Sequence, residues 1–402
     1  MLKKTHFLLA TTIFFLMGCS SPHEEKILLD HDVFNELAKT NELDAVIKDH
    51  FVELSVDTKT EANLLKEEIH HIAHEMGRCG GFTEDTPEDI ERFSKILDAQ
   101  KKISRSVNLR SLEFELTQVN QTKKVFEKVS KESIESTVGF LTSFETRSAR
   151  SSNPNKPLED FIKKVNEDLS DYKDQFSIEL LEHRGSNQGS VHVQIIGSEK
   201  PNEVVVIGGH IDSIVSSWFS SQAPGADDNA SGSAIVYESL KALLGSGVKP
   251  LRTIDFYWYG AEEQGLIGSK EIAKDYADRG VDVVAVMQLD MVLYPGNGDI
   301  IGLTEDFTDP VATAFIERIV TTHLNLPVER YKCGYGCSDH ASWNRNGFKT
   351  VYPFEATFRT HNRNIHSKRD VVDERLSFDH GLRFAKIATA FLMETAQSNI
   401  RF

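Results

Sequence analysis

Several features that mark whole classes of protein are scarce in this 402-residue sequence. It holds only 4 cysteines, too few for a disulfide-rich scaffold. No apolar stretch approaches the roughly 20 residues that a membrane-spanning helix needs, and no internal repeat is evident. Lys and Arg number 45 against 61 Asp and Glu, and the net charge of −16 would be repelled by phosphate backbones. We therefore expect no nucleic-acid partner.

What is present is enough apolar material for a large core, because hydrophobic residues make up 40% of the chain and 24 of them are Phe. The length allows roughly two to three domain-sized units. Changes of pattern along the chain divide it into residues 1–19, 20–125 and 126–402.

The first segment, 1–19, is typical of a signal peptide. Lys3 and Lys4 precede an apolar run, 7–17, that is too short to span a bilayer. The ending Leu-Met-Gly-Cys resembles a bacterial lipobox, in which Cys19 is acylated and becomes the mature N-terminus. Ordinary signal cleavage nearby stays open as the alternative. Both predict export: acylation gives an outer-membrane lipoprotein whose only membrane contact is the lipid anchor, and ordinary cleavage gives a secreted, extracellular protein.

The second segment, 20–125, is charged and poor in glycine, and we expect it to be mainly helical. A group of potential metal ligands lies within it: His70, His71, His74 and Cys79. His70 and His74 would share one face of a helix, a spacing that can hold a metal. Ordinary histidines on a packed or solvated helix are the favoured interpretation.

The third segment, 126–402, alternates helical patterns with buried strands. Near-continuous apolar runs, typical of strands covered on both faces, occupy residues 204–207, 254–259 and 283–287. Helical stretches, 232–244 and 265–277, lie between them. This alternation predicts an α/β domain with a mostly parallel, mixed central sheet flanked by helices.

Polar, chemically active side chains follow these strands at the point where each one ends. The strands are followed by Gly-Gly-His-Ile-Asp (208–212), Gly-Ala-Glu-Glu (260–263) and Gln-Leu-Asp (288–290). In open α/β sheets, sites form beyond the carboxyl ends of the strands. Imidazoles and carboxylates gathered at one edge are the ligands that zinc requires.

A glycine-rich loop, 224–232, opens the helix that follows the first of these strands. Such a loop can cradle a phosphate at a helix N-terminus. Here Asp227 and Asp228 stand where the anion would sit, and the loop contains no Lys. The loop therefore favours a cation.

In this order and spacing, the motifs GGHID, PGADDNASG, GAEEQGLIGS, MQLDM, CGYGCSDHASW and NIHSKRD resemble the bacterial leucyl aminopeptidases, secreted co-catalytic zinc exopeptidases of clan MH. The resemblance runs from about residue 130 to the C-terminus. It implies the zinc exopeptidase fold for residues 126–402. It also implies, more loosely, that residues 20–125 are a propeptide that a processing protease removes.

The resemblance also assigns the site. It implies two Zn²⁺ held by His210, Asp228, Glu263, Asp290 and His366. Asp228 would bridge the two ions. His210 and Asp290 would complete the first site, and Glu263 and His366 would complete the second. Glu262 would be the general base and Asp212 would fix the imidazole of His210. Three carboxylates and a bridging hydroxide would neutralise the two cations.

The implied reaction is hydrolysis of the N-terminal residue from a peptide with a free N-terminus. The family's apolar pocket corresponds here to Met291, Cys333, Tyr335, Cys337, Phe354, Phe358 and Ile365. This lining predicts a preference for Leu, Met or Phe, although each aromatic residue taken singly could equally be core packing. Tyr335 could also donate a hydrogen bond to the developing oxyanion.

Cys333 and Cys337 are separated by a short segment with two glycines, which allows a tight backbone path. A disulfide, as in the family, is the expectation, and a metal-binding cysteine pair is the alternative.

Two other functions stay open at this level. A glutaminyl cyclase-like enzyme would share the fold but use a single zinc. An exported binding domain would keep the fold without catalysis.

Overall fold

The computed structural model describes residues 25–48, 51–76, 82–84, 87–106, 114–215, 221–296, 298–357 and 359–402. Cys19, Cys79 and Phe358 lie outside these ranges, as do the side chains of His70 and His74, so the expectations placed on them are not tested. No helix within these ranges is long and apolar enough to cross a membrane.

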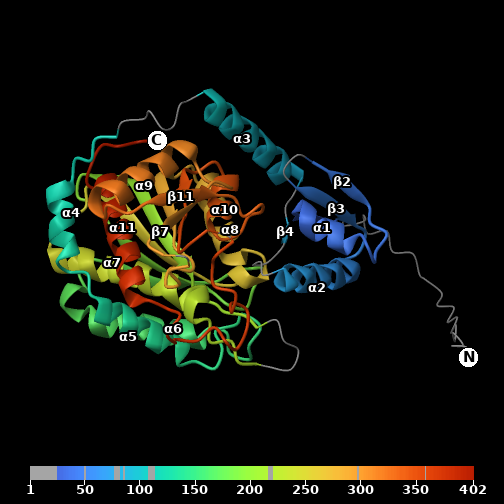
Figure 1. Ribbon diagram of the computed structural model, residues 1–402, viewed down its shortest axis with the longest axis horizontal. Helices are drawn as coiled ribbons and strands as arrows, with labels where there is room; N and C mark the ends of the chain where they lie inside the picture. The colour runs from blue at the N-terminus through green and yellow to red at the C-terminus, as the bar shows by residue number, and fades with distance from the viewer. Residues whose placement is uncertain are drawn as a thin grey trace, which may run out of the picture.

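Residues 25–106 form a small N-terminal module, which stands beside a larger domain in Figure 1. Its elements are β1 (Glu25–Leu29), α1 (His31–Leu37), β2 (Ala45–Ile47), β3 (Val52–Val56), α2 (Lys59–Glu75), β4 (Phe82–Glu84) and α3 (Pro87–Ser106). The strands form an antiparallel sheet in the order β2-β3-β1-β4, the arrangement of a split βαβ fold. Helices hold most of its residues, as expected, but the sheet was not expected.

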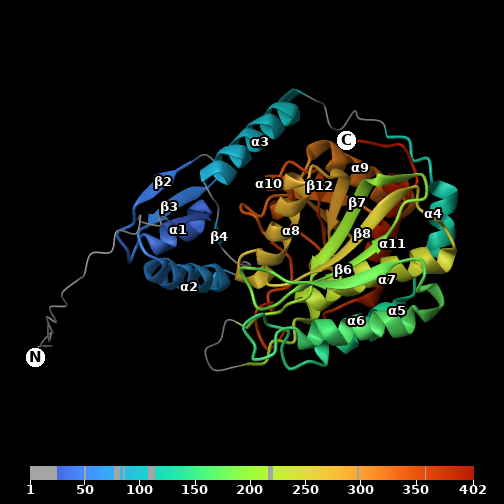
Figure 2. The same ribbon diagram turned by 180° about the vertical axis from the view of Figure 1, so that it is seen from behind.

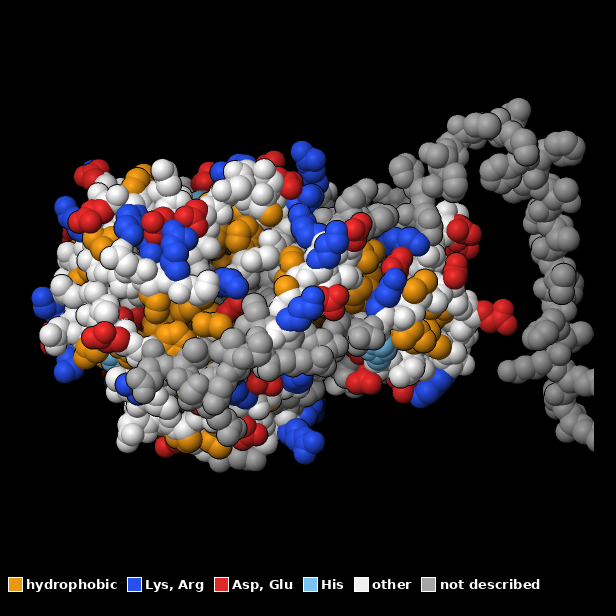
Figure 3. All heavy atoms as spheres, turned by 90° about the horizontal axis from the view of Figure 1, so that it is seen from above, with side chains coloured by type: hydrophobic (Ala, Val, Ile, Leu, Met, Phe, Trp, Pro, Cys, Tyr) orange, Lys and Arg blue, Asp and Glu red, His pale blue; other side chains and the backbone are white. Residues whose placement is uncertain are grey.

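The module has a core of its own, separate from that of the larger domain. One face of the sheet packs on α1 and α2 through buried apolar residues: Ile27, Leu29, Val33, Leu37, Val52, Leu54, Val56, Ala62, Ile69 and Ala73. In β3 the buried positions alternate, which is the period of a strand covered on one face. Figure 3 shows the module as a smaller lobe, with positive and negative side chains interspersed on the face seen there.

Helix α3 joins the module to the larger domain. Phe93 on this helix is 2% exposed, and its ring stacks on Phe307 at 5.4 Å and lies 5.0 Å from the guanidinium of Arg345. Arg92 donates a hydrogen bond to the Asn346 side chain at 2.8 Å. We call Phe93, Phe307 and Arg345 the docking cluster.

The larger domain is built on a six-stranded sheet in the order β12-β9-β7-β8-β6-β5. Four strands pair in parallel: β7 (Lys200–His210), β8 (Arg252–Tyr259), β9 (Asp282–Gln288) and β12 (Thr350–Val351). At one edge, β6 (Ser190–Ile195) and β5 (Ser177–Leu181) are antiparallel. The predicted α/β class with a mostly parallel, mixed sheet is therefore confirmed.

Helices cover both faces of this sheet, as Figure 2 shows. One face carries α7 (Gly232–Ser246) and α11 (Phe378–Ala396), with α5 (Lys131–Thr142), α6 (Lys156–Asp168) and the short η2 (Ser170–Tyr172). The other carries α8 (Ile267–Asp278) and α10 (His340–Arg345). Within β8, Phe256 and Trp258 face the first layer whereas Tyr257 and Tyr259 face the second. Burial on both sides explains the unbroken apolar run.

A second, smaller sheet extends the domain. Its order is β11-β10-β13, formed by β10 (Ile301–Thr304), β11 (Val328–Tyr331) and β13 (Pro353–Phe354), next to α9 (Pro310–His323). Asp309 caps α9 by accepting the N–H groups of Val311 and Ala312 at 3.0 and 2.9 Å.

The segment before residue 126 already belongs to the larger domain. Helix α4 (Val119–Phe126) packs on α7 and α11, and Val125 is 1% exposed. Phe114 contacts Phe315 edge to face at 5.3 Å, and Glu394 accepts the N–H of Thr117 at 2.9 Å. The boundary expected at 125/126 thus falls at the end of a helix whose buried side lies in this core.

Candidate metal centre

The residues proposed for chemistry converge at the carboxyl ends of three parallel strands. His210 is the last residue of β7, and Asp290 follows β9 by two residues. Glu262 and Glu263 begin η4 (Glu262–Gln264), the turn after β8. Asp228 lies in η3 (Ala226–Ser231), between β7 and α7. His366 comes from the loop before α11, far along the chain.

Two glycines, one in β7 and one at the start of α7, allow the chain to approach the segment after β9 closely. A Cβ at Gly209 would lie 2.4 Å from the carbonyl oxygen of Leu289, and one at Gly232 would lie 2.2 Å from the same atom. The side chain of Asn229 donates to that carbonyl at 3.0 Å. The residue after Leu289 is Asp290, so these contacts bring a predicted ligand that follows β9 next to β7.

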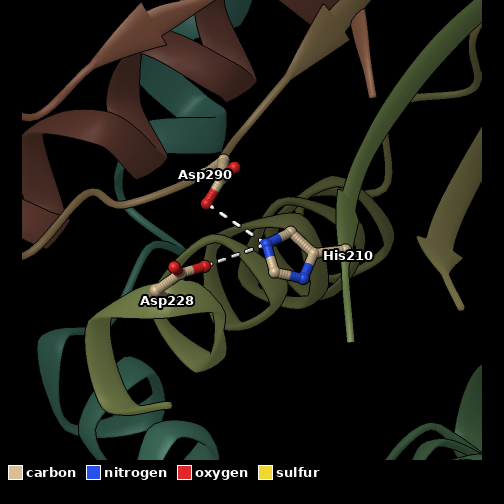
Figure 4. A group of neighbouring side chains, drawn as sticks. All are labelled: His210, Asp228 and Asp290. Carbon is tan, nitrogen blue, oxygen red and sulfur yellow. Dashed lines mark ion pairs between the residues drawn. The ribbon is translucent and has the colours of Figure 1, made fainter. Parts of the chain in front are cut away.

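The five predicted ligands form two groups that share Asp228. In the first, drawn in Figure 4, Nε2 of His210 lies 3.1 Å from Oδ1 of Asp228 and 3.4 Å from Oδ1 of Asp290. In the second, Nε2 of His366 lies 3.0 Å from Oδ2 of Asp228 and 3.5 Å from Oε2 of Glu263. The two carboxylate oxygens of Asp228 therefore face one histidine each.

The donor set fits zinc. The ligand atoms of each group lie within 4.8 Å of one another, and all five side chains are buried. Among the described residues, neither oxygen of Glu263 nor Oδ1 of Asp290 has a hydrogen-bond partner. Buried carboxylates without partners are costly unless a cation satisfies them. Imidazole nitrogen with carboxylate oxygen is a set that zinc accepts.

Glu262 lies beside these groups without belonging to either. It is fully buried, and neither of its carboxylate oxygens has a hydrogen-bond partner in the described part of the chain. Burial raises the pKa of Glu262 well above its usual range; His210 opposes this effect, whereas Glu263 and Asp339 add to it. A carboxylate that is costly to keep charged accepts a proton readily, as a general base must.

Asp212 contacts more than the imidazole. Nδ1 of His210 lies 3.2 Å from the backbone oxygen of Asp212 and 3.4 Å from its carboxylate. The two oxygens of this carboxylate also accept the N–H groups of Glu262 at 3.1 Å and of Glu263 at 3.2 Å. Asp212 thus contacts a predicted ligand and also holds the turn that carries the predicted base, a second contact that the sequence did not indicate.

The disulfide between Cys333 and Cys337 is confirmed, with their Cα atoms 6.5 Å apart. The apolar residues expected in the substrate pocket gather in one cluster with Tyr352: Met291, Cys333, Tyr335, Cys337, Phe354 and Ile365. Tyr331 packs against the same cluster. Tyr331 and Tyr352 were missed, because nothing in their local sequence separates them from ordinary strand residues.

Other residues around the ligands were also missed. Ser338 donates to Asp290 at 2.7 Å, and Gln288 donates to Ser338 at 2.9 Å. Ser338 belongs to the quoted motif CGYGCSDHASW, so its position in that motif was the available signal. Asp370 and Arg147, both buried, hold the loop that carries Asp228. Burial raises the pKa of Asp370 to about 8, with Asp227 adding to it, and a cation held by Asp228 would lower it.

Backbone strain gathers at the site. Four non-glycine residues in the turns around the predicted ligands and base have left-handed φ values: Ala261 (54°), Leu266 (61°), Met291 (55°) and His366 (54°). Such residues cost about 1–2 kcal/mol each and persist only where the surroundings determine them. The surrounding contacts therefore fix these turns.

Comparison with known proteins agrees with this geometry. Peptidase family M28 matches residues 190–392. Leucine aminopeptidase 1 of Coccidioides posadasii is 37% identical over 287 residues, covering 68% of this chain and 73% of that protein. Leucine aminopeptidase 1 of Fusarium vanettenii is 34% identical over 352 residues, covering 82% of this chain and 88% of that protein. The crystal structure of LapB from Legionella pneumophila is 29% identical with a TM-score of 0.76, covering 94% of this chain and all of that one. The chain therefore belongs to peptidase family M28, and its activity is that of a zinc-dependent aminopeptidase.

Proposed function

We propose that this protein is an exported aminopeptidase that uses two zinc ions to release large hydrophobic, Leu-like residues from the N-terminus of peptides. The observation that carries the proposal is the geometry of Asp228, whose two oxygens lie 3.1 and 3.0 Å from two different histidines. One carboxylate between two imidazole–carboxylate groups suits a pair of cations, as in two-metal hydrolases.

In this proposal His210 and Asp290 hold one ion, Glu263 and His366 hold the other, and Asp228 contacts both. Zinc, when bound, supplies a Lewis acid for the peptide carbonyl and lowers the pKa of water. The carboxylate of Glu262 takes the proton of the attacking water and returns it to the leaving amine. The apolar cluster around Met291 and Phe354 receives the side chain of the N-terminal residue.

The test is hydrolysis of leucine p-nitroanilide by mature protein, with and without a zinc chelator. We expect turnover that the chelator abolishes and added zinc restores, with two zinc ions per chain by metal analysis. Cyclisation of N-terminal glutamine with one bound zinc would favour the glutaminyl cyclase alternative. The absence of any chelator-sensitive reaction would favour the binding domain.

We propose that the chain belongs to the bacterial branch of these enzymes and is exported, with Cys19 as a lipid anchor. The lipobox-like ending of residues 1–19 supports this proposal, as does the similarity to LapB, which covers 94% of the chain. Mass spectrometry of the native N-terminus tests it. A diacylated Cys19 is the expected result, and an N-terminus without lipid at another residue would refute the anchor.

We also propose that the N-terminal module, residues 25–106, is a propeptide that a protease removes. Its separate core, together with the docking of α3 on α9 and α10, supports a part that can leave without unfolding the rest. The docking cluster adjoins the disulfide loop: a Cβ at Gly336 would lie 3.6 Å from Arg345 and 3.9 Å from Phe307.

If the docked module restrains the enzyme, Phe93→Ala should raise the activity of the unprocessed chain toward that of the processed one. Leu64→Ala is the matched control, because Leu64 belongs to the same module and is 64% exposed. Full activity of the unprocessed wild-type chain would refute an inhibitory role.

A further inference from the structure

Asp370 contacts three successive backbone N–H groups of the loop that carries the bridging ligand. Its carbonyl oxygen accepts the N–H of Ala226 at 3.1 Å. Its carboxylate accepts the N–H of Asp227 at 3.0 Å through Oδ1 and that of Asp228 at 3.0 Å through Oδ2. Asp370 is 1% exposed and belongs to neither ligand group.

This loop needs external partners because its backbone is not regular. Within η3, Asp228 (φ −111°, ψ 93°) and Asn229 (φ −133°, ψ 49°) are not helical. Backbone N–H groups that are buried outside a helix or sheet require other acceptors. Asp370 supplies them for three residues in a row, ending at Asp228 itself.

Asp370 also ties this loop to the segment of the second histidine. It lies four residues after His366, and its own N–H donates to the carbonyl of Ser367, the residue next to that ligand, at 3.1 Å. The backbone near His366 and the backbone of Asp228 are therefore joined through one residue, by its N–H group on one side and its carboxylate on the other.

Arg147 holds the other end of the same loop. Its guanidinium donates to the carbonyls of Pro224 at 2.6 Å and Gly225 at 2.9 Å, and to that of Ile211, next to His210, at 2.7 Å. The guanidinium of Arg147 thus donates hydrogen bonds to carbonyl groups of the loop, and the carboxylate of Asp370 accepts hydrogen bonds from its N–H groups.

We propose that Asp370 is a positioning residue that sets the orientation of the Asp228 carboxylate, and through it the affinity of the site for both zinc ions. The inference rests on the proposed two-zinc function. Replacement of Asp370 should weaken both ions together, because Asp228 is common to the two groups. It should leave the binding of the substrate side chain nearly unchanged, because none of these hydrogen bonds involves the apolar cluster.

The test compares Asp370→Asn with wild type in the mature protein. The amide keeps the size but turns one acceptor into a donor that faces a backbone N–H. Zinc is titrated into metal-free protein against a chromophoric chelator, and kcat and KM for leucine p-nitroanilide are measured in excess zinc. We expect a roughly 10–100-fold loss of zinc affinity at both sites, a lower kcat and a KM within about twofold.

Asp309→Asn is the matched control, because Asp309 is also 1% exposed and accepts two successive backbone N–H groups, but at the start of α9. It should alter thermal stability without altering zinc affinity. Asp370→Glu keeps a carboxylate and should recover part of the affinity; it replaces Asp370→Asn if that variant does not fold.

Wild-type zinc affinity in Asp370→Asn, or an equal loss in Asp309→Asn, would overturn the inference. A wild-type protein that binds fewer than two zinc ions, or that does not hydrolyse the substrate, would instead refute the proposed function.

Discussion

Arg147 offers a quantitative test of how the candidate metal centre is held in place. It is fully buried, and its guanidinium donates four hydrogen bonds to backbone carbonyls, those of Leu141, Ile211, Pro224 and Gly225. Burial lowers the pKa of Arg147 to about 10, so the group remains charged at neutral pH. We predict that Arg147→Met destabilises the fold and loosens the site.

The magnitude follows from two opposing terms. Four hydrogen bonds from a charged donor contribute roughly 6 kcal/mol at the lower end of their usual range. The net drop in pKa from 12.5 to about 10, in which nearby carboxylates such as Asp370 and Asp212 partly offset burial, corresponds to about 3 kcal/mol against the charged guanidinium. The net loss expected for Arg147→Met is therefore about 3 kcal/mol of unfolding free energy, and somewhat more if the four carbonyls stay without donors.

Arg252→Met is the matched control. Arg252 is also fully buried and donates to Glu203 at 2.6 Å, but it begins β8, at the end of the strand away from Glu262. Urea unfolding should show a comparable loss for both variants, whereas only Arg147→Met should also lower zinc affinity. A stability change below about 1 kcal/mol for Arg147→Met, or equal zinc affinity in both variants, would refute the reasoning.

Three further predictions concern separate parts of the chain. Glu262→Gln should keep its zinc while kcat falls roughly 10²–10⁴-fold; turnover near the wild-type rate would remove Glu262 from the role of base. Burial lowers the pKa of His192, but the carboxylates of Asp255 and Glu179, each 3.0 Å away, outweigh it and raise that pKa above 6.5. The stabilisation from His192 should therefore be complete below about pH 6.5 and fade as the pH rises through the raised pKa. Urea unfolding of wild type and His192→Gln from pH 5 to 9 tests this, and a constant difference between their unfolding free energies would contradict it. Replacing Cys333 and Cys337 by Ser should lower the unfolding free energy by about 2 kcal/mol, the closure entropy of a short loop. It should also raise KM more than it lowers kcat, because the loop holds Tyr335. An unchanged KM would show that this loop does not take part in substrate binding.

The central sheet could be predicted from the sequence because its signal is local. Residues 204–207, 254–259 and 283–287 are apolar without interruption, and each lies within a strand that helices cover on both sides. The strand ends then located His210, Glu263 and Asp290, since parallel strands deliver their carboxyl ends to one edge. Asp228 and His366 do not directly follow a strand of this sheet, and the family resemblance assigned them.

The N-terminal sheet carried no comparable signal. Strands β2 and β4 have three residues each, too few to show a period of two. Strand β1 holds the sheet together through pairs well separated in sequence, Leu29 with Val52 of β3 and Leu29 with Phe82 of β4. In this segment of the sequence, only the helical patterns could therefore be recognised.

The hydrogen bonds around the predicted ligands could not be predicted from the sequence, for a related reason. The carboxylate of Asp212 meets an N–H group 50 residues away, and that of Asp370 meets one 143 residues away. In the sequence, Asp212 and Asp370 each look like one aspartate near a histidine. Their partners are backbone N–H groups, which almost every residue has and which no sequence pattern marks. Residue identity can propose a ligand, but the acceptor of a distant N–H becomes apparent only when the chain is folded.

The left-handed turns at Ala261, Leu266 and Met291 bear on any attempt to make this enzyme more heat-resistant. Glycine would adopt the same φ values without steric cost, so a search guided by folding energy alone would be drawn to these positions first. Each turn lies near a predicted ligand or the proposed base. A glycine there would make the backbone more flexible, and the neighbouring side chain would no longer keep one position. Gains in melting temperature obtained at these positions should therefore come with slower turnover, whereas gains obtained elsewhere in the domain should not.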